Sequence, residues 1–366
     1  MPGPDPVAGA EQVAGRLEDD LVARQADLLG LVPVAAHVVG HHRRKQAFDR
    51  RQQGNREFAE DIAFVGRLED ARRLLQEAHA GFEEIGYLFL LDDVIHLQQF
   101  RAALALQESL GVDSRELTVD QARELVPQIE THELVGATYS PRDGRAMPEA
   151  VVQGYAAAAA ERGVRIRQGV AVQKIPTLGN KILGVETSAG RVRTDTVVCT
   201  AGIWSRELAH LVGVELPVTG EPRWMHYAAD AGDLAERVPL TIDFTSGFYF
   251  HRDGPGLVFG GREPTIEGVA THATRRLPLL TDLPIQSSWW GYYEMSPDRN
   301  GIVGEAHEPR RFLYATGFSG HGFQQCPAVG EHIAELIAGR EPTIDLSPIS
   351  AARFADGKPR PERFVV

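Results

Sequence analysis

The chain contains very little cysteine, with only Cys199 and Cys326 among its 366 residues. Each lies in a stretch expected to be buried or next to a ligand, and two such cysteines can form neither a disulfide framework nor a CxxC metal site. Of the 13 histidines, His41 and His42 lie in a basic stretch, and the others show no H-x-x-x-H or mixed Cys/His spacing among themselves, so we predict no metal site. A reducing compartment fits this composition.

Long apolar runs are also missing. No uninterrupted stretch approaches the roughly 20 apolar residues of a membrane span, and the N-terminus has neither the basic nor the apolar region of a secretory signal. We therefore expect a cytoplasmic protein with no membrane span. The formal net charge of −12 disfavours nucleic acid and acidic membranes as partners, because both bind basic surfaces.

The G-x-G-x-x-G fingerprint of a dinucleotide-binding fold does not occur anywhere in the chain. Residues 1–80 instead contain two stretches with helical spacing, Glu11–Gly30 and Glu57–His79, separated by a basic, turn-rich segment. We expect this atypical part to be mostly helical or poorly ordered. It is a genuine replacement, the product of a shifted reading frame or misassigned start, or the mark of a fragment that needs another chain; we favour the shifted frame.

What the chain does contain favours a soluble α/β protein of two domains. A length of 366 residues exceeds the roughly 250 to 300 that one core serves, and 43% hydrophobic with 24% charged residues is ordinary for a globular protein. We assign residues 81–145 and 217–300 to one domain and residues 146–216 and 301–345 to the other, so the chain crosses between them more than once. Residues 346–366 form a C-terminal tail.

The stretch from Phe312 to Arg340 changes its backbone chemistry three times. An apolar run predicts a buried strand, a cluster of Gly317, Gly320 and Gly322 follows, and a helix with one apolar stripe ends at Gly339. Such an element directs open backbone N–H groups and the positive end of a helix dipole at one point, which suits an anionic or electron-rich ligand. A tight connection without a ligand is the competing interpretation.

A second element of this kind runs from the strand Val197–Thr200 through Ala201 and Gly202 into a helix expected over Trp204–Val212. It too can offer backbone N–H groups to a phosphate or a ring. Plain α/β packing is the alternative.

A hairpin is predicted from Phe248 to Phe259. Its alternation puts Tyr249 and His251 on one face and Arg252 on the other. Several antiparallel strands without intervening helices indicate a separate sheet here. The other expected elements include the strands Tyr87–Leu91, Leu134–Tyr139 and Val164–Arg167, and the helices Val94–Leu110, Pro148–Arg162 and one started by a capping box at Thr118 and Gln121.

Five stretches, in the expected order, resemble the FAD-dependent amine oxidoreductases grouped with D-amino-acid oxidase, glycine oxidase and sarcosine oxidase, and they look most like the sarcosine oxidase beta-subunit type. They are GYLFLL at Gly86, DGRAMP at Asp143, VVCTAGIWSREL at Val197, GYYEMSPDRNGIVG at Gly291, and GFSGHGF with the following AVGE. The likeness covers roughly Phe82 to the C-terminus. It implies an FAD-binding-like domain with its N-terminal βαβ unit missing or atypical, and an antiparallel-sheet substrate domain.

The resemblance also implies a function and a set of site residues. The function is oxidation of the C–N bond of a secondary amine or amino acid, of the sarcosine, glycine, proline or D-amino-acid type, by hydride transfer to flavin. The implied FAD contacts are Val172, Ala201, Gly202, Trp204, Gly317, Ser319, Gly320, His321, Gly322, Phe323 and Gln324.

Two positions depart from the monomeric sarcosine oxidases. Gln324 stands where those enzymes have a lysine implicated in oxygen activation, and Gly291 matches the position of their covalent flavin cysteine. We therefore expect non-covalent FAD. A dehydrogenase that passes electrons to a carrier or to another subunit is an alternative to an oxidase.

Tyr249 and Arg252 are the substrate-binding candidates, with Gln324 as the third catalytic candidate. The first two lie where the family's substrate sheet faces the flavin, and arginine is the usual bidentate partner of a carboxylate. Alternation prevents both from pointing at one site without a twist or a bulge. Tyr293 and Glu294 either line the same cavity or belong to the core.

Two other functions were weighed. A Ser-His-Asp hydrolase is disfavoured because the segment from Gly317 to Gly320 does not meet the G-x-S-x-G pattern. A catalytically silent or truncated family member that serves as a binding or assembly subunit, within a homo- or hetero-oligomer, remains the alternative because the dinucleotide fingerprint is missing.

Overall fold

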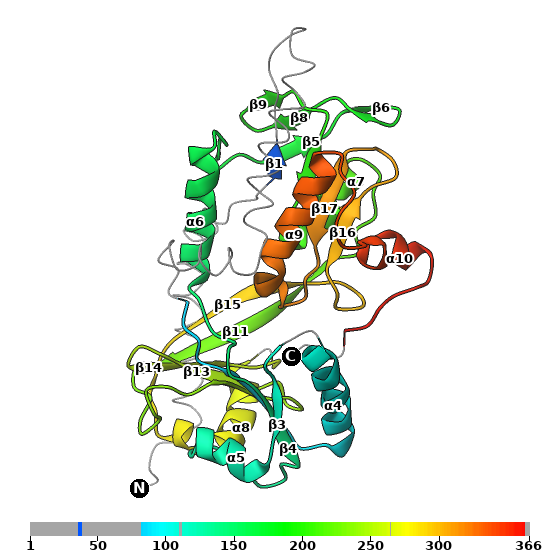
Figure 1. The fold of residues 1–366 in the computed structure, drawn as a ribbon. Coiled ribbons are helices and arrows are strands. Elements are labelled where there is room, and N and C mark those ends of the chain that lie inside the picture. Colours follow the sequence, from blue (N-terminus) through cyan, green and yellow to red (C-terminus); the bar gives the residue numbers. More distant parts are fainter. Residues whose placement is uncertain (1–35, 39–81, 110–111, 264, 363–366) are drawn as a thin grey trace, which may run out of the picture.

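The fold combines two main sheets with helices on their faces (Figure 1). The computed structural model describes residues 36–38, 82–109, 112–263 and 265–362. The helices predicted over Glu11–Gly30 and Glu57–His79 lie outside these residues. The mixed α/β class expected from the sequence is confirmed.

The larger sheet has eight strands in the order β15-β11-β14-β13-β12-β2-β4-β3. All neighbours are antiparallel except β12 and β2, which run parallel. The strands are β2 (Tyr87–Leu91), β3 (Arg115–Leu117), β4 (Gly136–Ser140), β11 (Thr219–Ala228), β12 (Leu240–Asp243), β13 (Tyr249–Asp253), β14 (Gly256–Gly260) and β15 (Ile285–Met295).

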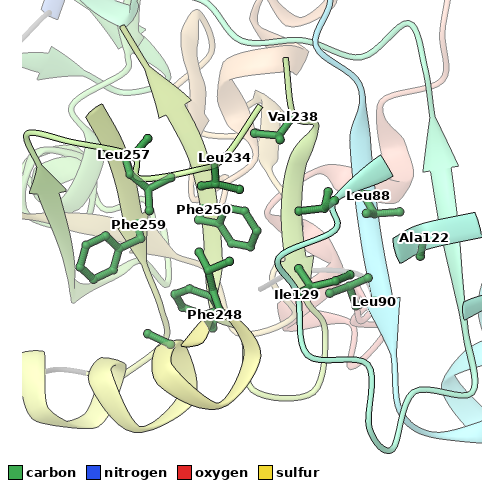
Figure 2. Close-up of a cluster of buried hydrophobic side chains, with 14 of the residues drawn as sticks. Leu88, Leu90, Ala122, Ile129, Leu234, Val238, Phe248, Phe250, Leu257 and Phe259 are labelled. Carbon is green, nitrogen blue, oxygen red and sulfur yellow. The ribbon is translucent and has the colours of Figure 1, made fainter. Parts of the chain in front are cut away.

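One face of this sheet is closed by α5 (Val119–Leu125) and α8 (Ile266–Arg276). Phe248, Phe250 and Leu88 pack there in one apolar cluster between the strands and the helices (Figure 2). On the opposite face, α4 (Val94–Ser109) contacts β2, β3 and β4 and packs its own apolar residues around Phe89. Among the described residues, α4 therefore covers the end of this face over β2, β3 and β4, while β13, β11 and β15 lie farther along the sheet.

The smaller sheet has the order β1-β10-β17-β16, with β1 (Ala36–Val38), β10 (Val197–Cys199), β16 (Ile302–Glu305) and β17 (Phe312–Thr316). Only β10 and β17 run parallel to each other. The long helix α9 (Gly322–Ile337) covers one face through Ile333, and α7 (Ser205–His210) covers the other through Leu208. Residues of β10, β16 and β17 are therefore buried on both faces of the sheet.

The remaining elements surround the smaller sheet. They are α6 (Pro148–Glu161), a three-stranded sheet of β5 (Val172–Lys174), β8 (Val185–Thr187) and β9 (Gly190–Val192), a pair of β6 (Thr177–Leu178) with β7 (Lys181–Ile182), α10 (Ala352–Ala355), and the 3-10 helices η2 (Gly202–Trp204) and η4 (Ser347–Ile349). The 3-10 helix η3 (Pro278–Thr281) instead follows α8 and packs against the apolar cluster of the larger sheet.

Several local predictions are confirmed. The strand predicted at Tyr87–Leu91 has those bounds in the structure. The capping box is present, because the Thr118 hydroxyl accepts a hydrogen bond from the Gln121 N–H and the Gln121 side chain accepts one from the Thr118 N–H. Gly339 follows α9 with a φ of 70°, as expected of a glycine that ends a helix.

Two predictions were wrong. Residues 164–167 form no strand, because Ile166 is exposed and no neighbouring strand pairs with this stretch. The second sheet was expected to contain no intervening helix, yet α8 lies between β14 and β15. The Thr265 side chain caps α8 by accepting a hydrogen bond from the Gly268 N–H. Val269 and Ala273 are buried and lie one helical turn apart. So few apolar residues at helical spacing predict a helix only weakly, and the segments on both sides carry strand patterns.

Candidate functional site

The two strand-glycine-helix elements lie side by side. Since β10 and β17 are parallel neighbours in register, with Cys199 opposite Tyr314, their carboxyl ends meet at one edge of the sheet. Ligands bind at such edges in open α/β sheets. The Thr316 hydroxyl also lies 3.2 Å from the carbonyl oxygen of Gly202 and donates a hydrogen bond to it. Both elements therefore converge on one point, which the sequence could not show.

Residues 317–322, called the glycine loop below, hold a conformation that few side chains tolerate. Gly317 and Gly320 have φ values of 71° and 93°, and Ser319 has a φ of 55°. Ser319 is fully buried, its hydroxyl donates to the Gly317 carbonyl oxygen at 3.1 Å, and it accepts from the Ser296 N–H at 3.1 Å. These bonds compensate for the left-handed conformation of a non-glycine residue.

The loop also forms a cradle that a side chain would fill. A Cβ added to Gly320 would lie 2.4 Å from Cε2 of Tyr293. Helix α9 begins directly afterwards, and the His321 side chain makes no capping bond to it. The first-turn N–H groups beside this bare backbone therefore suit the electron-rich edge of a flavin ring, so these residues fit the cofactor that the resemblance implies.

Glu294 ties this loop to the larger sheet. One carboxylate oxygen accepts from the Thr316 hydroxyl at 2.8 Å, and the other accepts from the Phe318 N–H at 3.4 Å. The Glu294 carbonyl oxygen accepts from the Ser319 N–H at 2.9 Å. From the sequence Glu294 was only a possible lining residue, whereas the structure shows it bonded to the strand and the loop.

Three tyrosines stand on the face of the larger sheet that meets the glycine loop: Tyr87, Tyr249 and Tyr293. Burial, reinforced by Tyr293 and Asp143, raises the pKa of Tyr87 to about 12. Burial also raises the pKa values of Tyr249 and Tyr293 above their usual range. All three phenols are therefore neutral near pH 7 and able to donate hydrogen bonds.

Arg223, which the sequence analysis missed, lies among these tyrosines. Its register partner is Gly291, and its guanidinium carbon sits 5.3 Å from the centre of the Tyr293 ring. Its Nη2 bonds Glu221 at 3.0 Å and its Nη1 bonds the Pro222 carbonyl oxygen at 3.0 Å. The only signal in the sequence was an arginine directly before the aromatic and apolar residues Trp224 and Met225.

The Nε–H of Arg223 is buried, and it has no hydrogen-bond partner among the residues that the structure describes. Leaving a charged donor in this state is unfavourable, and a ligand that supplies an acceptor removes the penalty. Arginine donates best to a carboxylate. The arrangement therefore suits a small molecule with a carboxylate that binds at the tyrosine face beside Arg223.

The structure does not bring Arg252 to Tyr249, and the expectation of a shared role is corrected. Arg252 points to the opposite face, where its Nη1 bonds the carbonyl oxygen of Leu234 and its Nη2 lies 3.4 Å from that of Pro255. Because β13 keeps its regular alternation, no bulge turns the arginine around.

The other predicted residues have varied surroundings. Phe323 and Gln324 are exposed at the start of α9, and Trp204 is exposed at the end of η2. Val172 is half-buried in β5, which belongs to a different sheet from the strand that leads into the glycine loop. The list is completed by Ala201, which is buried, and Gly202, which has a φ of 56°.

His321 is held by both ring nitrogens. Its Nε2 lies 2.9 Å from the Arg299 carbonyl oxygen, and its Nδ1 lies 2.8 Å from Nε2 of Gln325. The imidazole therefore anchors the loop. Among the described residues, no cluster of His, Cys, Asp or Glu could hold a metal ion, and no helix is long and apolar enough to cross a membrane.

The sequence is similar to those of curated proteins. Over 320 residues the chain is 26% identical to mitochondrial sarcosine dehydrogenase of Homo sapiens, covering 78% of the chain and 34% of that protein. Over 317 residues it is 25% identical to 4-methylaminobutanoate oxidase (formaldehyde-forming) of Paenarthrobacter nicotinovorans, covering 80% and 38%. The chain thus spans little more than a third of the length of these relatives.

Solved structures and a family model agree with these relatives. L-proline dehydrogenase from P. horikoshii is 26% identical and superposes with a TM-score of 0.75 over 88% of each chain. Glycine oxidase from Bacillus cereus shares the fold, with a TM-score of 0.62 at 22% identity over 85% of each chain. The family model described as DAO, FAD dependent oxidoreductase, matches residues 35–336, starting upstream of Phe82, where the resemblance began. The chain therefore belongs to the family of FAD dependent oxidoreductases.

Proposed function

We propose that the chain oxidises the C–N bond of a small amino acid or N-alkyl amino acid with FAD as the cofactor. The observation that carries this proposal is the unpartnered, buried Nε–H of Arg223 on the tyrosine face that meets the glycine loop. A substrate carboxylate supplies the missing acceptor. The names of sarcosine dehydrogenase and L-proline dehydrogenase among the similar proteins support the same class of substrate.

FAD, when bound, accepts the hydride from the substrate, and the chain has to position both partners. With FAD bound, the N–H groups at the start of α9 would stabilise negative charge that develops on the ring. Arg223 binds the substrate carboxylate, and the neutral hydroxyls of Tyr249 and Tyr293 orient it. Tyr293 also packs against Gly320, so the substrate face and the ring-binding loop keep a fixed separation.

Two positions bear on how the flavin is held and on the electron acceptor. Gln324 is uncharged and exposed, and Gly291 has no side chain that could form a thioether. We therefore propose a non-covalent flavin and a dehydrogenase that passes electrons to a carrier or a partner chain. A silent subunit is the alternative, because the dinucleotide fingerprint is missing from the sequence.

The test compares substrates with and without a carboxylate. Protein reconstituted with FAD is mixed with an artificial electron acceptor and with sarcosine or dimethylamine, and separately with L-proline or pyrrolidine. We expect reduction of the acceptor with the acids and little with the matched amines. Equal rates within both pairs would remove Arg223 from substrate binding, and a chain that retains no FAD after desalting would favour the silent subunit.

A further inference from the structure

A buried ion pair near the C-terminus lies behind the glycine loop. Arg353 binds Asp298 with both ends of its guanidinium group, Nε to Oδ2 at 2.7 Å and Nη2 to Oδ1 at 2.8 Å. The two side chains are only 2% and 1% exposed. Such paired, charge-assisted bonds fix orientation as well as distance. The pair therefore holds the chain after β15 rigidly against α10.

The rest of the C-terminal segment, residues 347–362, adds to this attachment. The N–H of Arg360 donates to Oδ2 of Asp298 at 2.8 Å, and the N–H of Glu362 donates to the Asp298 carbonyl oxygen at 2.8 Å. Asn300 donates to the Arg360 carbonyl oxygen at 2.6 Å. In Figure 1, this segment follows α10 at the side of the smaller sheet and then turns toward the larger one.

From Asp298 the contacts continue to the glycine loop. The Ser296 hydroxyl shares its single proton between two acceptors, the Asn300 carbonyl oxygen at 2.7 Å and Oδ1 of Asp298 at 3.2 Å. The N–H of Ser296 then donates to the Ser319 hydroxyl at 3.1 Å. A second connection runs from the Arg299 carbonyl oxygen to His321. Both ends of residues 319–321 are thus tied to the turn that Arg353 holds.

We propose that Arg353 and Asp298 are positioning residues that keep the glycine loop in its ring-binding shape, so that the C-terminal segment completes the flavin site without touching it. Ser319 needs this support because its left-handed backbone is unfavourable for a residue with a side chain. The inference depends on the flavin lying at the glycine loop. It is independent of the identity of the substrate.

The experiment compares Arg353→Met with Arg276→Met. Arg276 forms an equally buried pair with Asp243, at 2.6 Å and 2% and 8% exposure, but in the core of the larger sheet. Hydrogen exchange of the amides of residues 318–322 is measured in the chain without FAD, and the FAD dissociation constant is measured by flavin fluorescence. For Arg353→Met we expect loop protection to fall and the FAD dissociation constant to rise, each at least about tenfold, because small misplacements of a binding group have large effects. Arg276→Met should leave the FAD dissociation constant unchanged. It should change the protection of the loop amides no more than its global stability changes.

Arg353→Lys should lie between the wild type and Arg353→Met, because lysine keeps the charge and loses the paired geometry. Should Arg353→Met fail to fold, Asp298→Asn keeps the size of the side chain and tests the same contacts. Equal loop exchange in Arg353→Met and Arg276→Met, or unchanged exchange in Asp298→Asn, would overturn the inference. Neither readout requires substrate or turnover, so a wrong proposal about the substrate would leave the exchange result standing.

Discussion

At the scale of single residues, the proposed function assigns recognition of the substrate carboxylate to Arg223. We expect Arg223→Met to raise KM for a carboxylate-bearing substrate by about 100-fold, since losing one partner of a buried charged hydrogen bond costs about 3 kcal/mol. Steady-state kinetics with sarcosine or L-proline would measure the change. Arg252→Met is the matched control, because Arg252 bonds carbonyl groups on the opposite face of β13. An equal loss in both variants would contradict the assignment.

The tyrosines predict how stability depends on pH. Burial raises the pKa of Tyr87 to about 12, so the folded protein keeps the phenol neutral at a pH where the unfolded chain ionises it. The stability that this residue contributes is fully present below about pH 10, the usual pKa of tyrosine, and is lost as the pH rises toward 12. Urea denaturation between pH 9 and 12 should show a smaller decrease in the free energy of unfolding for Tyr87→Phe than for the wild type.

At the scale of elements, the glycine loop and the helix that follows it tolerate side chains very differently. Gly320→Ala places a Cβ 2.4 Å from Tyr293 at a φ of 93°, so the loop or the tyrosine must move. We expect FAD binding to weaken at least about tenfold. Fluorescence titration with FAD would measure it.

Gly330→Ala is the control within α9. Nothing lies within 4 Å of a Cβ at that position, and alanine favours the helix by about 0.5–1 kcal/mol. FAD affinity should stay the same while the melting temperature rises. A loss of FAD in Gly330→Ala would mean that the effect at Gly320 reflects general damage to the helix.

At the scale of the whole molecule, Glu294 couples the two sheets. Glu294 lies near the end of β15, paired with Gly220 of β11, and its carboxylate accepts a hydrogen bond from Thr316 at the end of β17. A double-mutant cycle of Glu294→Ala and Thr316→Val should give a coupling free energy of about 1–2 kcal/mol, as for a hydrogen bond to a charged group. Additive effects in chemical denaturation would show that the bond between the Glu294 and Thr316 side chains does not couple the two sheets.

The sequence by itself determined what depends on neighbouring residues. The strand Tyr87–Leu91, the capping box at Thr118 and the glycines that begin α9 all follow from backbone propensities and local hydrogen bonds, and each is present in the structure. The α/β class followed from the same patterns. The resemblance of five short stretches indicated the family and the cofactor, which the comparisons confirm.

Only the tertiary structure decided which side chains meet. Arg223 faces Tyr293 because of the register between β11 and β15, and a shift of one residue would send it to the other face. Arg353 and Asp298 are 55 residues apart and pair only after the C-terminal segment has packed. Contacts between residues so far apart in the sequence depend on how whole sheets and segments pack. The spacing of neighbouring residues does not determine that packing.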